Sequence, residues 1–148
     1  MDDALDELYQ AIILQHHRSP KNEGVLEPYT HSAEGFNPLC GDRITVYTRE
    51  DDQVLSAVRF VAEGCAISRA SASIMTTRTT GLPLDTVRER IREVLTLLAG
   101  KEEPAIDLDS LGELVALTGV RRFPARIKCA TLAWHALRNA LNGNREIA

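Results

Sequence analysis

Cysteine is scarce in this sequence, with only three residues among 148. Their number is odd and they lie far apart in the chain, so they make a poor disulfide framework. In a reducing compartment, such cysteines are more often used for metal binding or for thiol chemistry. The scarcity of cysteine therefore directs attention to what three thiols could do together.

The chain also lacks an excess of positive charge, a long apolar run and a leader-like start. Its formal net charge of −4 argues against a nucleic-acid-binding surface. No apolar run approaches the roughly 18 residues that a membrane span requires. The acidic start Met1-Asp2-Asp3 leads into no apolar segment, so we predict no signal peptide and no membrane association. We expect a cytoplasmic protein in which residues 1–148 form a single domain.

Helical and strand periodicities are both present along the chain. Apolar spacing predicts a helix over residues 3–17, and a loop with a short strand near 29–34 follows it. Strands over 43–49 and 54–61 are joined by a polar turn and predict a β-hairpin. Further helices are predicted from Cys65 to Gly81, from Asp85 to Gly100, over 111–117 and from Pro124 to Asn142, with a linker over 101–108.

Cys65 lies where the second hairpin strand ends and the next helix begins. Unpaired backbone N–H groups and the positive end of the helix dipole gather at a helix N-terminus. Both favour the thiolate, which is the form of cysteine that acts as nucleophile and metal ligand. The preceding Gly64 leaves room for another group to approach the backbone closely.

The hairpin predicts which residues Cys65 meets. Cys40 and Asp42 are two residues apart in extended backbone before the first strand, so they can point to one side. A hairpin returns its second end beside its first, which makes Cys40, Asp42 and Cys65 neighbours. Cys129, in the second turn of the last helix, can face the same point. Three thiolates and one carboxylate would suit tetrahedral Zn²⁺, while the alternative is that each cysteine is a small buried hydrophobe.

Three motifs surround these residues: Cys40-Gly41-Asp42, Glu63-Gly64-Cys65-Ala66-Ile67-Ser68 and Phe123-Pro124-Ala125-Arg126-Ile127-Lys128-Cys129. Together they resemble the iron–sulfur assembly family of IscU and the NifU N-terminal domain, and most of all its SufU branch. The resemblance covers nearly the whole chain. It implies an α+β fold with a small three-stranded antiparallel sheet and helices packed against it. It also implies a metal site of Cys40, Asp42, Cys65 and Cys129, and a PLP-dependent, SufS-like cysteine desulfurase as partner.

Two departures from the scaffold members of this family affect the functional hypothesis. Scaffold members place a histidine just before the last cysteine, but here Lys128 stands there, and a protonated lysine has no lone pair for a metal. The stretch from Gly100 to Val120 is also longer and resembles SufU. The proline-rich chaperone motif of scaffold members is not reproduced at Phe123–Ile127.

Both departures favour a zinc-bound, sulfurtransferase-like sulfur acceptor that passes persulfide sulfur to downstream iron–sulfur assembly proteins. A scaffold that builds a [2Fe–2S] cluster on the same ligands is one alternative, and a structural zinc domain that serves as an interaction module is another. We predict Cys40 as the accepting thiol, because it lies on a loop, where local opening costs least.

Other polar residues are expected to have ordinary roles. His16 and His17 are predicted to end the first helix, and His31 and His135 to be solvated. Trp134 is predicted to lie in the core. Arg126 is expected to contact a partner or a persulfide, or else to form a surface salt bridge.

Overall fold

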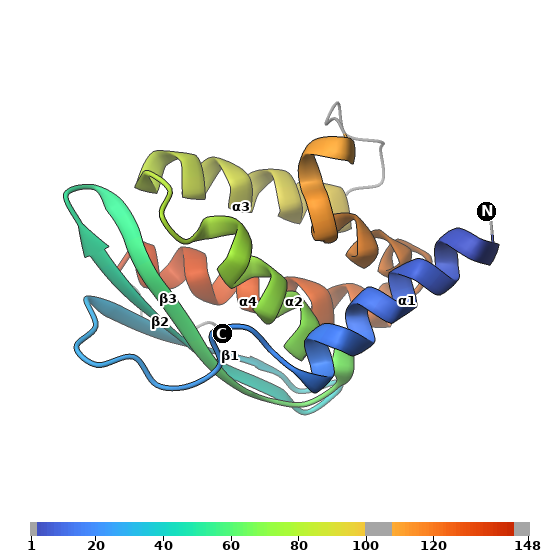
Figure 1. The fold of residues 1–148 in the computed structure, drawn as a ribbon. Coiled ribbons are helices and arrows are strands. Elements are labelled where there is room, and N and C mark those ends of the chain that lie inside the picture. Colours follow the sequence, from blue (N-terminus) through green and yellow to red (C-terminus); the bar gives the residue numbers. More distant parts are fainter. Residues whose placement is uncertain (1–2, 100–107, 144–148) are drawn as a thin grey trace.

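The computed structural model describes residues 3–99 and 108–143, which form helices and one antiparallel sheet (Figure 1). Helix α1 spans Asp3–Arg18 and precedes three strands, β1 (His31–Asn37), β2 (Asp42–Asp51) and β3 (Val54–Glu63). Helices α2 (Ala66–Thr79) and α3 (Leu84–Ala99), the 3₁₀ segment η1 (Leu108–Arg122) and helix α4 (Pro124–Leu141) follow. The predicted α+β fold with a three-stranded sheet is confirmed.

The sheet has the order β1-β2-β3, and its register determines where the functional residues lie. Asn37 at the end of β1 pairs with Asp42 at the start of β2. Arg43, the next residue of β2, pairs with Glu63 at the end of β3. The turn after β1 and the junction after β3 therefore lie at the same end of the sheet, as the hairpin predicted.

The helices pack on one side of the sheet, where α4 contacts β1 and β2, and α2 contacts β3 (Figure 1). Alternation in β3 buries Val58 and Phe60, at 2% and 0% exposure, and turns Arg59 outward. Trp134 of α4 is fully buried in the same core, and its Nε1–H donates to Ser71 Oγ at 3.0 Å. This side of the sheet thus carries the hydrophobic core.

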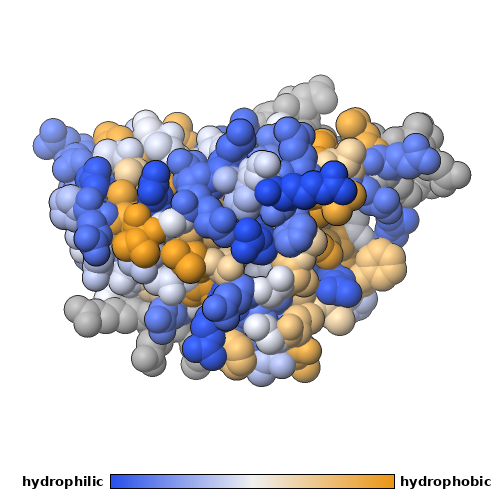
Figure 2. All heavy atoms as spheres, turned by 60° about the horizontal axis from the view of Figure 1, so that its bottom comes forward, coloured by the Kyte–Doolittle hydropathy of each residue, from blue (hydrophilic) through white to orange (hydrophobic). Residues whose placement is uncertain are grey.

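The other side of the molecule has a mixed surface. In the view that brings the lower side of Figure 1 forward, hydrophobic side chains form separate patches among hydrophilic ones (Figure 2). Large apolar side chains that are exposed include Phe36, Leu39 and Phe123. None of the described helices is long and apolar enough to cross a membrane.

Several element boundaries differ from the predictions. The first strand runs over 31–37, further along the chain than the predicted 29–34. Helix α3 begins at Leu84, one residue before the predicted start at Asp85, which lies in its first turn. The predicted helix over 111–117 is part of the longer 3₁₀ segment η1, which is interrupted at Gly112 with φ 58°. Residues 101–107 of the predicted linker and the predicted helix end at Gly100 lie outside the described residues, while Leu108, the last residue of that linker, begins η1.

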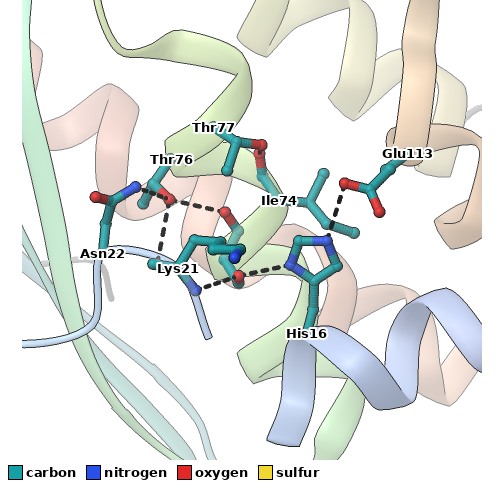
Figure 3. A network of polar contacts seen from close by, with 8 residues as sticks. His16, Lys21, Asn22, Ile74, Thr76, Thr77 and Glu113 are labelled. Carbon is teal, nitrogen blue, oxygen red and sulfur yellow. Dashed lines mark hydrogen bonds and ion pairs between the residues drawn. The ribbon is translucent and has the colours of Figure 1, made fainter. Parts of the chain in front are cut away.

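His16 is at the end of α1 as predicted, but it is 4% exposed and joins three elements (Figure 3). Its Nδ1 lies 2.7 Å from Ser73 Oγ of α2, and its Nε2 lies 3.1 Å from Glu113 Oε1 of η1. Ser73 Oγ also accepts the backbone N–H of Lys21 at 2.7 Å. These bonds fasten α1 and the chain after it to α2 and η1.

His31 and His135, which were predicted to be solvated, are both partly exposed, and each also contacts a neighbouring side chain. His31 is half-buried, and its Nδ1 lies 2.7 Å from Glu50 Oε2. His135 is also half-buried, and its Nδ1 accepts a hydrogen bond from Arg138 Nη2 at 3.0 Å. Burial, and secondarily the charge of Arg138, lower the pKa of His135.

Candidate metal centre

Residues from three separate parts of the chain meet at the end of the sheet. Cys40 lies in the short turn between β1 and β2, and Asp42 is the first residue of β2. Cys65 is the N-cap residue of α2, as the sequence predicted, and makes no side-chain cap hydrogen bond. Cys129 lies in the second turn of α4, which packs across β1 and β2. The fold therefore gathers the four predicted residues.

Three of these four residues have donor atoms close enough to share one ion. Ligand atoms of Cys40, Asp42 and Cys129 all lie within 4.8 Å of one another, and the two sulfurs are 3.4 Å apart. Cys65 reaches the same group through Asp42, because its Sγ lies 3.9 Å from Asp42 Oδ2. Its backbone N–H also donates to Asp42 Oδ1 at 2.9 Å. Such a set of soft and carboxylate ligands is typical of zinc sites.

Burial and charge at Asp42 test whether a metal fits. The Asp42 side chain is 0% exposed, and no ion pair involves it within the described ranges 3–99 and 108–143. A buried carboxylate is unfavourable without a compensating charge. A divalent cation among the thiols would supply that charge, so the residues present fit a metal ion. Cys40, Asp42 and Cys129 can hold one.

The three thiols have different environments. Cys129 is buried, Cys65 is intermediate and Cys40 is exposed. In the metal-free protein, burial raises the pKa of the Cys129 thiol, and hydrogen bonding with Asp42, Cys40 and Cys65 raises it further. A cation bound to the sulfur reverses this preference, because a coordinated thiol is deprotonated.

Gly64 makes the contact between Asp42 and Cys65 possible. Its φ is +138°, a conformation that favours glycine. A Cβ built at this position would lie 2.9 Å from the Asp42 Cα and still closer to its carboxylate. The close approach that the sequence predicted at Gly64 is therefore confirmed, and Asp42 is the group that approaches.

Arg126 carries a positive charge that interacts with the thiols of this site. Its exposed guanidinium faces the thiols, so that the charge of Cys65, a hydrogen bond with Cys129 and the charges of Cys129 and Cys40 raise the pKa of Arg126. No ion pair with a carboxylate involves it among the residues that the structure describes. The surface salt bridge that we considered is therefore absent there.

Lys128 has a different neighbourhood. Its side chain is exposed and lines a cavity of about 480 Å³ beside the Cys40 turn, together with Leu39, Leu132 and His135. The interpretation that Lys128 is not a ligand stays a prediction. Asn37, which sequence reasoning missed, also lines this cavity, and its Nδ2 lies 3.8 Å from Cys129 Sγ.

Comparison with known proteins shows the family to which this chain belongs. Residues 8–130 match the model of the NifU-like N terminal domain family, and the chain belongs to this family. It is 42% identical over 134 residues to the zinc-dependent sulfurtransferase SufU of Bacillus subtilis (strain 168), with 90% of this chain and 88% of that protein covered. It is 36% identical to the iron-sulfur cluster assembly scaffold protein IscU of Streptococcus pyogenes serotype M1, over 93% and 84% of the two chains.

A solved structure supports the same relationship. The crystal structure of FiSufU, a protein assigned to the SUF system of Fervidobacterium islandicum AW-1, superposes with a TM-score of 0.80 at 32% identity. The superposition covers 88% of this chain and 93% of that chain. The resemblance to SufU and IscU proteins that the cysteine motifs predicted is thus confirmed over most of the chain.

Proposed function

We propose that this protein is a zinc-dependent sulfur acceptor, which takes persulfide sulfur from a PLP-dependent cysteine desulfurase for iron–sulfur cluster assembly. The observation that carries the proposal is the convergence of Cys40, Asp42 and Cys129 within 4.8 Å, with only Cys40 exposed among the three cysteines. The name of the Bacillus subtilis relative, a zinc-dependent sulfurtransferase, supports it. Three free thiols also fit a reducing compartment such as the cytoplasm.

Cys40, Asp42, Cys65 and Cys129 would be the ligands of the zinc ion. When bound, the ion would keep the thiols deprotonated and prevent them from pairing as disulfides. Asp42 would hold the centre together from the protein side, because its Oδ1 accepts the Cys65 N–H at 2.9 Å while Oδ2 faces the sulfurs. This hydrogen bond fixes Cys65 against the start of β2.

Cys40 is the thiol best placed to accept sulfur. Cys129 is buried within a helix, and Cys65 is held at a strand–helix junction through its backbone. Cys40 alone combines exposure with a position in a turn, so it can reach another protein with the smallest change in structure. Access and thiolate character together set the rate of thiol exchange.

The transfer step is balanced without an external oxidant or reductant. The Cys40 thiolate attacks the outer sulfur of the desulfurase persulfide and forms a new S–S bond. The bond between that outer sulfur and the desulfurase cysteine breaks, and its electron pair leaves on the desulfurase thiolate. The transferred sulfur keeps its proton and its oxidation level. The product is a persulfide on Cys40.

Persulfide mapping tests the assignment. Wild-type protein and the three single Cys→Ser variants are incubated with desulfurase and cysteine, and mass spectrometry then locates the added sulfur. We expect sulfur on Cys40 in the wild type, and neither persulfide nor stimulated turnover with Cys40→Ser. If Cys40→Ser still stimulates turnover and carries its persulfide on Cys65 or Cys129, the assignment is wrong.

Metal analysis distinguishes the proposal from the cluster scaffold, which the IscU relatives suggest. Protein purified without added metal is expected to be colourless and to contain one zinc ion per chain. A brown preparation with visible absorbance would instead favour a [2Fe–2S] scaffold. A zinc protein that leaves desulfurase turnover unchanged would favour a structural zinc module that acts in protein interactions.

A further inference from the structure

Asn37 is the last residue of β1 and is only 4% exposed. It takes part in three hydrogen bonds around the Cys40 turn. Its Oδ1 accepts the backbone N–H of Leu39 at 3.3 Å, and its main-chain carbonyl accepts that of Gly41 at 2.9 Å. Its Nδ2–H donates to Cys129 Sγ at 3.8 Å. One residue therefore closes the turn that carries Cys40 and also contacts a second cysteine of the site.

The orientation of the amide follows from its partners. A backbone N–H can only donate, so the atom that faces Leu39 has to be the oxygen. The NH₂ group is then left for Cys129 Sγ, which as a thiolate can only accept. Asn37 thus acts as a two-sided link, whose acceptor end holds the Cys40 turn and whose donor end holds Cys129.

The donor end makes the thiols chemically unequal. Among the hydrogen bonds of the described residues, the N–H groups that reach a cysteine sulfur belong to the Asn37 amide and the Arg126 guanidinium, and both reach Cys129. The backbone N–H of Cys65 goes to Asp42 instead. A hydrogen bond to an ionised acceptor stabilises its charge and so reduces its readiness to attack an electrophile. Cys129 receives this stabilisation, whereas Cys40 does not.

We propose that Asn37 is a positioning residue that ties the Cys40 turn to Cys129 and directs sulfur onto Cys40. The proposal rests on the proposed function, because it concerns which thiol of the sulfur acceptor reacts. Asn37 Oδ1 holds the turn that presents Cys40 at the surface, and Asn37 Nδ2 keeps Cys129 an unreactive ligand. The two effects act in the same direction, and both depend on one amide.

The test uses Asn37→Asp, which keeps an oxygen for the Leu39 N–H but replaces the donor toward Cys129 with an acceptor. Asn22→Asp is the matched control, because Asn22 Nδ2 donates to Thr76 Oγ1 at 2.9 Å and makes no described contact with a cysteine. Two readouts are taken on the metal-loaded proteins: the alkylation rate of each cysteine with iodoacetamide, and the distribution of persulfide after incubation with desulfurase and cysteine.

We expect the ratio of Cys40 to Cys129 alkylation to fall about tenfold in Asn37→Asp, the factor associated with one hydrogen bond to a charged group. Persulfide is expected to appear on Cys129 as well as on Cys40, whereas Asn22→Asp behaves as the wild type. An unchanged ratio and unchanged persulfide distribution in Asn37→Asp would overturn the proposal.

Failure of the proposed function and failure of the Asn37 proposal give different results, and a second variant is available. If wild-type protein forms no persulfide on any cysteine, the proposed function fails, while the alkylation ratio still decides the role of Asn37. If Asn37→Asp does not fold, Asn37→Ser replaces it, because a serine hydroxyl can also accept the N–H two residues on but is too short to reach Cys129. The same fall in the alkylation ratio is expected for Asn37→Ser.

Discussion

The contact between Gly64 and Asp42 supports a sharp prediction for Gly64→Ala. A Cβ at position 64 would lie 2.9 Å from the Asp42 Cα, which cannot move without shifting the start of β2. It would also overlap the Asp42 carboxylate, which can escape only by giving up its 2.9 Å hydrogen bond to the Cys65 N–H. The substitution therefore acts on the backbone and on the site together.

The magnitude has three parts. Holding alanine at the φ of +138° costs about 1–3 kcal/mol. Losing a buried hydrogen bond to a charged carboxylate costs about 1.5–3 kcal/mol. Reduced freedom of the unfolded chain returns about 0.4–1 kcal/mol. We expect a net destabilisation of about 3 kcal/mol, which corresponds to a melting temperature lower by about 6–12 °C at this chain length.

Gly41→Ala and Gly81→Ala are the matched controls. Both glycines have positive φ, +71° and +86°, but a Cβ at either position would meet nothing within 4 Å. We expect each control to lose about 1 kcal/mol, from backbone strain alone. Urea unfolding and zinc content are measured for all three variants. If Gly64→Ala unfolds at the same urea concentration as the two controls and keeps stoichiometric zinc, the close contact of Gly64 with Asp42 does not contribute to stability or to the site.

Three further predictions concern single side chains. Cys65→Ala is expected to lose its zinc and to unfold at lower urea, because metal binding contributes to folding; stoichiometric zinc in this variant would exclude Cys65 as a ligand. Lys128→Ala is expected to keep full zinc content by elemental analysis, and zinc loss from the folded variant would show that Lys128 belongs to the site. The lowered pKa of His135 means that the unfolded chain binds its proton more readily, so stability falls as pH drops below about 6.5. In His135→Gln the urea midpoint should therefore change less between pH 7 and pH 5 than in the wild type, and the same change in both proteins would contradict this.

The meeting of the cysteines could be predicted because it depends on short-range geometry. Cys40, Asp42 and Cys65 flank one hairpin, and the register of β2 with β3 brings its two ends together. The position of Cys129 needed only a helix that crosses the same end of the sheet. The single-domain organisation and the ligand roles of these residues stay predictions.

The exact position of β1 could not be predicted because its residues have little intrinsic preference for strands. The segment His31–Asn37 contains alanine, glutamate, glycine and asparagine, which are uncommon in strands. Its pairing with β2 and its packing under α4 outweigh that preference. At Gly35 a Cβ would lie 2.9 Å from Leu132 Cδ1, so a larger residue would require the Leu132 side chain to shift where α4 packs on the strand. A contact of this range has no local signal.

The burial of His16 was missed for a similar reason. Its partners Ser73 and Glu113 lie 57 and 97 residues further along the chain. Glu113 lies in η1, where helical periodicity is weak and Gly112 interrupts the segment. The sequence showed a histidine at a helix end, but only the assembled fold shows which groups surround its ring.

Arg126 and Lys128 show that some of the missed detail was present in the sequence. Arg126 and Cys129 are three residues apart in α4, so they share one face of the helix, whereas Lys128 is one residue from Cys129 and points about 100° away. This spacing explains why the guanidinium of Arg126 faces the thiols and why Lys128 lines the neighbouring cavity beside Leu39. The cation that faces the thiols is therefore the one at i−3. Lys128, directly before Cys129, instead lines the cavity beside the turn that carries Cys40.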